Sequence, residues 1–232
     1  MKAVILAGGE GRRLLPSTAS LPKAMMPVGN KPILELVMGQ LKPLGIEEIL
    51  IATGYREEAI RSYFGDGAQV GIPIRYSRED KPLGTAGPLS LVRQHLGEPF
   101  LVTNGDIVTD IDFRALLDRH RTAAHDVTLA LASRKQYIDF GVVGLDEQRM
   151  FGNWDEKPVL QYLVSMGICV MNPQVLALLP SNTFLNMPDF VVSLKQAGLR
   201  IGAYVHDGYW LDIGRREDYE RACRDAESLC LK

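Results

Sequence analysis

Strand-like and helix-like segments alternate along the first 106 residues, and this alternation constrains the fold more than any other feature of the sequence. Short apolar runs rich in β-branched residues lie at 2–8, 47–54, 72–80 and 99–106. Segments with apolar residues at helical spacing separate them, at 32–46, 56–67 and 84–97. This order predicts a parallel sheet with helices on both faces. Such sheets bind ligands beyond the carboxyl ends of their strands, so polar residues that directly follow a strand are the first candidates for a site.

The second half of the chain is less regular. We expect strands at 126–134 and 165–173, a strand and hairpin over 137–158, and a strand pair over 200–214. Helices are expected at 186–198 and at 215–229. The prediction is an α/β fold with a Rossmann-like, mixed but mainly parallel sheet flanked by helices, and with a smaller lobe inserted in the second half.

Charge and cysteine content narrow the class of protein. The 232 residues carry a formal net charge of −2, so the basic excess typical of nucleic-acid or membrane-surface proteins is missing, and neither partner is expected. The cysteines are odd in number and match no zinc spacing, which indicates reduced thiols in a cytoplasmic protein: Cys169, Cys223 and Cys230. The apolar run at the N-terminus is too short for a signal sequence, and no run reaches membrane-spanning length.

The loop after the first strand is the most distinctive local feature. Gly8, Gly9 and Gly11 can expose backbone N–H groups in a concave nest of the kind that binds phosphate. Arg13 adds a fork of donors for phosphate oxygens, and Lys23 a further cation. A glycine-rich turn that merely packs closely is the alternative. A dinucleotide fingerprint is excluded because its third glycine is missing, and a Walker loop because no G-K-[ST] follows.

Six motifs, in order along nearly the whole chain, resemble the signature of the sugar-1-phosphate nucleotidyltransferases. The first is LAGGEGRRLLPSTASLPKAMMPVGNKPILE, starting at Leu6, and the others are PLGTAGPL (82–89), NGD (104–106), FGVV, EKP (156–158) and GYWLDIG (208–214). The resemblance is strongest to short members similar to mannose-1-phosphate guanylyltransferases. It implies one domain over 1–232, with a nucleotide-binding lobe at about 1–110 and a sugar-phosphate-binding lobe with the C-terminal helix at about 111–232.

The resemblance also implies the chemistry. Such enzymes join a nucleoside triphosphate to a sugar 1-phosphate and release pyrophosphate. A phosphate oxygen is already a competent nucleophile, so the protein has to position two polyanions and neutralise charge with cations and a metal. A homodimer is compatible with this interpretation, and Mg²⁺ is the expected cofactor.

The site residues that the resemblance implies fall into two sets. Arg13, Lys23, Asp106, Lys157 and Asp212 form the catalytic set, in which Lys157 holds the sugar phosphate. The nucleotide-binding set adds Leu6, Ala7, Gly8, Gly9, Gly11, Glu79, Gly84, Thr85, Ala86 and Asn104. The sugar-phosphate set is Gly141, Glu156, Lys157, Ser165 and Gly167.

Two carboxylates from distant parts of the sequence are the expected metal ligands. Asp106 closes one strand and Asp212 ends another, and carboxylate oxygens are the ligands that Mg²⁺ prefers. Either one alone reads as a helix cap. Asp110 and Asp112 are expected to be cap or turn residues.

The identity of the base depends on Glu79. An ionised carboxylate only accepts hydrogen bonds, which suits the two adjacent donors of guanine better than the single imide donor of uracil or thymine. GTP is therefore favoured, and a surface acid is the alternative reading of Glu79. Three positions depart from the family pattern, namely Arg12, Phe140 and Ser165; Ser165 replaces an asparagine that contacts the sugar.

Three other functions stay open. One is a uridylyl- or cytidylyltransferase for another sugar or amino-sugar phosphate. Another is a non-catalytic homologue that binds nucleotide sugar and regulates a partner, although the complete catalytic set argues against it. The last is transfer to a phosphorylated alcohol, which the EKP motif disfavours.

Overall fold

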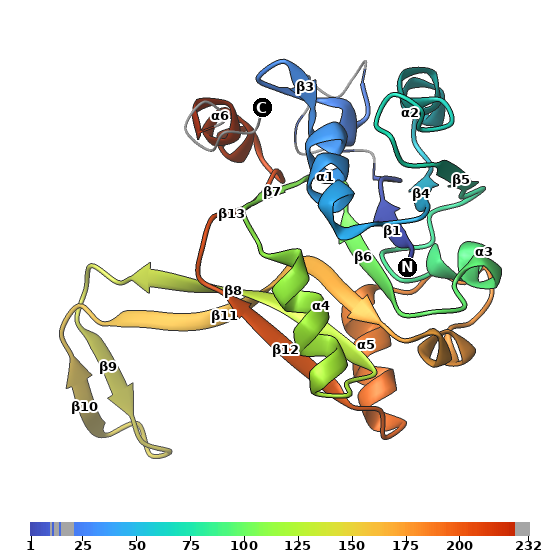
Figure 1. Cartoon of the computed structure of the whole chain (residues 1–232). Helices are drawn as coiled ribbons and strands as arrows, with labels where there is room; N and C mark the ends of the chain where they lie inside the picture. The colour runs from blue at the N-terminus through green and yellow to red at the C-terminus, as the bar shows by residue number, and fades with distance from the viewer. Residues whose placement is uncertain (10, 12–13, 15–20, 226–232) are drawn as a thin grey trace.

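The computed structural model describes residues 1–9, 11, 14 and 21–225. Seven strands form its central sheet in the order β12-β8-β11-β6-β1-β4-β5 (Figure 1). Their bounds are β1 Ala3–Leu6, β4 Ile49–Thr53, β5 Ile74–Arg78, β6 Phe100–Asn104, β8 Val127–Tyr137, β11 Val159–Met171 and β12 Ile201–His206. Strands from both halves of the chain therefore share one sheet.

The sheet is mixed and mainly parallel, as the sequence predicts. Strand β1 pairs in parallel with β4 and β6, β4 with β5, and β12 with β8. Only β11 runs antiparallel to its neighbours β6 and β8 in this sheet. The carboxyl ends of β1, β4, β5 and β6 consequently meet at one edge, where a ligand site is expected.

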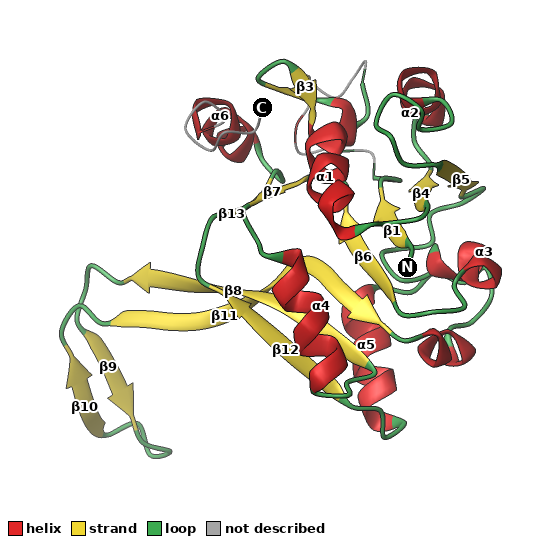
Figure 2. Cartoon of the chain, viewed as in Figure 1, coloured by secondary structure: helices red, strands yellow, loops and turns green. Residues whose placement is uncertain are grey.

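Helices cover both faces of the sheet (Figure 2). Successive residues of β1 alternate between the two cores, since Ile5 lies in one buried cluster and Val4 in the other. The first core includes apolar residues of α1 (Ile33–Leu41), α2 (Glu57–Phe64), α4 (Phe113–Thr122) and α6 (Arg216–Asp225). The second core is covered by α3 (Leu89–Val92) and α5 (Met187–Gln196).

Local sequence explains where the helices begin and end. In α1 the buried residues Ile33, Val37 and Leu41 recur every four positions, which places them on one helical face. Pro43 follows directly and cannot continue the helix, and the chain turns at Gly45. Asp112 caps α4, because its side chain accepts a hydrogen bond from the N–H of Ala115 at 3.0 Å.

Three pairs of short strands complete the fold. Strand β2 (Pro27–Val28) pairs with β3 (Lys31–Pro32), and β7 (Ile107–Thr109) pairs with β13 (Trp210–Asp212). Strand β9 (Val142–Leu145) pairs with β10 (Phe151–Asp155) in a hairpin that projects from the body. Within the described residues, no helix combines the length and apolar character needed to cross a membrane.

Two expectations about elements need correction. The helix expected over 84–97 is mostly absent: turns occupy 84–88, α3 has only four residues, and a 3-10 turn follows at Arg93–His95. Leu185 occupies the loop's donors, because its carbonyl accepts from the N–H groups of Ala86 and Gly87. The strand pair over 200–214 is two strands in different sheets, β12 and β13.

Candidate active site

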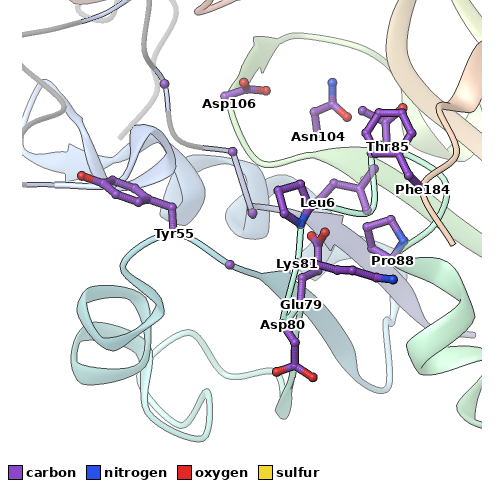
Figure 3. A pocket seen from close by; sticks show the side chains of 16 residues that line it. Leu6, Tyr55, Glu79, Asp80, Lys81, Thr85, Pro88, Asn104, Asp106 and Phe184 are labelled. Carbon is purple, nitrogen blue, oxygen red and sulfur yellow. The ribbon is translucent and has the colours of Figure 1, made fainter. Parts of the chain in front are cut away.

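A cleft of about 660 Å³ opens at the carboxyl ends of β1, β4, β5 and β6. Figure 3 shows Asp106 and Asn104 lying on one side of this cleft, and Glu79 and Lys81 on another. The lining residues come from four strand ends and from the loop before α5: Leu6, Gly8, Gly9, Gly11, Gly54, Tyr55, Glu79, Asp80, Lys81, Pro82, Gly84, Thr85, Pro88, Asn104, Asp106 and Phe184.

Most residues of the expected nucleotide-binding set lie in this lining. They are Leu6, Gly8, Gly9, Gly11, Glu79, Gly84, Thr85, Asn104 and Asp106. Ala7 and Ala86 do not, because both are buried and their N–H groups donate to the carbonyls of Ala52 and Leu185. Thr85 lines the cleft but its hydroxyl is engaged, accepting from the N–H of Met187 at 2.7 Å. Arg12 and Arg13 fall outside the described residues.

Strand pairing brings the two expected metal ligands together. Asp106 lies in the turn between β6 and β7, and β13 pairs with β7 so that Asp212 stands opposite Ile107. The N–H of Ile213 donates to the carbonyl of Asp106 at 3.1 Å, which fixes this register. Residues 106 positions apart in sequence therefore share one edge of the cleft.

Lys23 lies between the two carboxylates. Its ammonium forms an ion pair with Asp106 and a second one with Asp212, with 3.5 Å between Lys23 Nζ and Asp212 Oδ1. The lysine side chain is only 14% exposed and that of Asp106 only 20%, so solvent screens this pair weakly. The arrangement shows that a cation can be held by both carboxylates at once.

The surroundings of Asp106 fit a metal ion. Burial raises the pKa of the Asp106 carboxyl and the nearby charge of Asp212 raises it too, whereas Lys23 lowers it. Asp106 Oδ1 is buried with no hydrogen-bond partner among the described residues, so one oxygen is left for a ligand. No group of three or more metal-binding side chains occurs in the described part of the chain. Two carboxylates with substrate phosphates and water are the usual set for Mg²⁺.

Glu79 is held rigidly at the end of β5. Its Oε2 accepts a hydrogen bond from the N–H of Leu83 at 2.7 Å, and its Oε1 faces the glycine loop. A Cβ at Gly8 would lie 2.6 Å from Oε1, so glycine is needed for this close approach. Burial raises the pKa of the Glu79 carboxyl, while the Leu83 hydrogen bond lowers it. One acceptor oxygen is thus fixed and the other faces the cleft.

Two residues of the sugar-phosphate set lie beside the cleft. Gly167 packs against Asn104, because a Cβ at Gly167 would lie 2.5 Å from Asn104 Nδ2. Ser165 precedes it at a register shift in β11, and its hydroxyl accepts from the N–H of Gly167 at 3.3 Å. The bulge in β11 therefore turns this segment toward Asn104.

The other three residues of that set lie away from the cleft, contrary to expectation. Glu156 and Lys157 occupy the turn between β10 and β11, and Gly141 packs against the ring of Trp154 in the same hairpin. From Val159 to Ser165 alone the extended strand spans roughly 20 Å. Glu156 accepts from the indole N–H of Trp154 at 2.9 Å. The sequence motif does not reveal that the hairpin projects from the body (Figure 1).

Several lining residues were not anticipated. Tyr55 follows β4, and Asp80 and Lys81 follow β5, so the rule about strand carboxyl ends would have found them. Phe184 comes from the loop before α5 and carries no sequence signal. Asp110 hydrogen-bonds His206 at 2.8 Å, and lies in a turn as expected.

Comparison with known proteins gives a consistent result. A family model described as Nucleotidyl transferase matches residues 2–228. A mannose-1-phosphate guanylyltransferase of Mycobacterium tuberculosis is 34% identical over 230 residues, which cover 96% of this chain and 64% of that protein. The chain thus spans less than two thirds of that relative's length. A D-glycero-α-D-manno-heptose 1-phosphate guanylyltransferase of Aneurinibacillus thermoaerophilus is 30% identical, with coverage of 98% and 99%.

Among solved structures, one from Bacillus anthracis superposes with a TM-score of 0.80 and 28% sequence identity. It is described provisionally as a glucose-1-phosphate thymidylyltransferase in complex with sucrose, and the match covers 97% of this chain and 95% of that one. The relatives therefore share a fold and a reaction type, and differ in the nucleotide that they are named for.

Proposed function

Because this chain belongs to the nucleotidyl transferase family, we propose that it transfers a nucleotidyl group, GMP from GTP by preference, to a sugar 1-phosphate. The acceptor is mannose 1-phosphate or a related hexose or heptose 1-phosphate, and the products are a nucleotide sugar and pyrophosphate. The observation that carries this proposal is the convergence of Asp106, Asp212 and Lys23 at one edge of the cleft.

The step is an in-line displacement. A phosphate oxygen of the sugar 1-phosphate attacks the α-phosphorus, the bond from that phosphorus to the bridging oxygen breaks, and pyrophosphate leaves. Asp106 and Asp212 would hold Mg²⁺, which when bound neutralises charge on the phosphates. Lys23 and Arg13 would contact the triphosphate and the leaving pyrophosphate. No side chain has to act as a base, because the nucleophile is already an anion.

The base and the sugar are selected by different parts of the chain. Glu79 would accept hydrogen bonds from the N1–H and 2-amino groups of guanine, and the fixed Glu79–Leu83 contact supports this role. Ser165 and Gly167, beside Asn104, would contact the sugar. Glu156 and Lys157 would bind the sugar phosphate only if the projecting hairpin approaches a cleft.

We also infer a cytoplasmic protein, supported by the free thiols of Cys169 and Cys223; Cys230 lies outside the described residues. A homodimer is proposed as well, and the surface that would form it is argued in the next subsection.

The function is tested by measuring pyrophosphate release. GTP, UTP, CTP and dTTP are each offered with a panel of hexose and heptose 1-phosphates and Mg²⁺. The proposal predicts turnover that is fastest with GTP and that stops when a chelator removes the metal. Turnover with UTP alone would contradict the guanine assignment, and no turnover with any pair would contradict the enzyme assignment.

A further inference from the structure

A projecting arm leaves the body of the molecule between residues 135 and 163. It consists of the end of β8, the β9–β10 hairpin and the start of β11, drawn in yellow and olive in Figure 1. Within the described part of the chain, β9 and β10 pair only with each other. An isolated two-stranded ribbon is marginally stable in water, so the arm needs something to pack against.

Apolar side chains concentrate on this arm. Twelve of the eighteen exposed large apolar residues in the described chain lie between 137 and 163, among them Phe140, which is 77% exposed. Leu145 and Phe151 face each other across the hairpin and are 60% and 67% exposed. The consecutive residues Val159 and Leu160 point to opposite faces of the ribbon, and each is 48% exposed. Both faces of the arm are therefore apolar and uncovered.

The accessible surface of the whole chain is large for its mass. It measures 12481 Å², whereas a compact monomer of 25.7 kDa is expected to expose about 10,400 Å². The excess of roughly 2,000 Å² per chain exceeds the ~800 Å² that each partner buries in a standard interface. Monomers rarely expose a continuous apolar patch of more than a few hundred Å².

We infer that the arm is a dimerisation surface and that its occupant is a second copy of this chain. A two-fold axis brings the same surface of each copy together, so the apolar faces of two arms cover each other. The rim of the arm carries both signs of charge, with Lys135 and Lys157 against Asp139, Asp155 and Glu156, and so is complementary to itself. The surface area is sufficient for an obligate interface. The inference does not depend on the chemistry proposed for the cleft.

Sedimentation equilibrium over roughly 1 to 100 µM tests this inference, because association follows mass action. We expect wild type to have twice the 25.7 kDa mass of the chain. Leu145→Ser with Phe151→Ser should raise the dimer dissociation constant at least ~100-fold, since each change removes a large apolar contact. The matched control is Leu178→Ser with Val192→Ser, two exposed apolar residues away from the arm, and it should leave the mass unchanged.

Hydrogen exchange of the arm distinguishes the occupants. In a dimer, the amides of 142–155 become more protected as wild-type concentration rises, and the arm variant loses this dependence. A wild-type mass of one chain throughout the range would overturn the inference. So would concentration-independent protection of the arm in a monomer, which would mean that the arm packs on its own body. A dimer that the arm variant leaves intact would place the interface elsewhere.

Discussion

At the scale of single residues, the account depends most on Asp106. Its carboxylate contacts Lys23, lies beside Asp212 across paired strands, and keeps one buried oxygen without a partner among the described residues. A structural ion pair would satisfy both oxygens. The unsatisfied oxygen is what favours a metal ligand over a helix cap or a packing pair.

Asp106→Asn is expected to lower kcat at least ~1,000-fold, because it removes a charged ligand that holds the metal against the phosphates. Steady-state pyrophosphate release measures this loss. Asp118→Asn is the matched control, since Asp118 lies exposed on α4. Unchanged activity in the Asp106 variant would show that the carboxylate does not hold the catalytic metal.

Glu79→Gln is expected to lower kcat/KM for GTP by about 10- to 100-fold and to leave UTP less affected. The amide oxygen can still accept from Leu83, which turns the NH₂ group toward the donors of guanine and leaves them unpaired. Competition between GTP and UTP in one reaction measures the ratio. An unchanged ratio would return Glu79 to the role of a cleft-lining acid.

The pH dependence of the same position has a definite sign. Burial raises the pKa of Glu79, so its charge is complete above that raised value and is lost as pH falls through it. The KM for GTP should therefore increase on acidification, starting above the ordinary range of a glutamate. UTP serves as the control for titration of the phosphates, and the Gln variant should lose the GTP-specific part.

At the scale of elements, the 84–88 loop shows why a sequence motif and a helix prediction can disagree. Gly84 has φ +77°, and a Cβ there would lie 2.6 Å from the carbonyl of Leu185. The loop is shaped by the segment before α5, about 100 residues away, which no local pattern encodes. The result is a turn that lines the cleft in place of a helix.

Gly84→Ala is expected to destabilise the fold by more than Gly198→Ala. Both glycines have positive φ, but a Cβ at Gly198 meets nothing within 4 Å. The Gly198 variant should cost only the backbone term of about 1 kcal/mol, whereas Gly84→Ala adds the clash. Thermal unfolding measures the difference, and KM for GTP should rise only in the Gly84 variant. Equal losses of stability would mean that the loop adjusts freely.

The EKP motif makes a prediction about the arm. If the arm approaches a cleft during turnover, Lys157→Ala should lower kcat/KM for the sugar 1-phosphate by about 10- to 100-fold, because a charge-assisted contact to phosphate is lost. The KM for GTP should not change. Lys135→Ala, on the same arm, is the control. An unchanged sugar-phosphate KM would exclude Lys157 from the acceptor site.

At the scale of the whole molecule, the first half of the chain was predictable. Apolar runs and helical spacing gave the strands β1, β4, β5 and β6 and the edge at which the cleft opens, because a parallel sheet leaves little choice of geometry. The positions of Gly8, Glu79, Asn104 and Asp106 in the lining agree with the expectation.

The parts that could not be predicted depend on tertiary contacts. Asp212 reaches Asp106 only through the pairing of β13 with β7, three residues each, which is too short to be read from a pattern. Ala86 looks like a backbone donor for the base until Leu185 occupies its N–H. The direction of the arm, and hence the place of Lys157, depends on contacts that the single chain does not contain.

The most direct measurement of the central claim follows the α-phosphorus of GTP. Wild-type protein is incubated with GTP labelled at that phosphorus, mannose 1-phosphate or a heptose 1-phosphate, and Mg²⁺, and the products are separated. The account predicts that the label appears in the nucleotide sugar, with one unlabelled pyrophosphate released for each label transferred. Label that remains in GTP with every acceptor, or that appears only as free GMP, would contradict it.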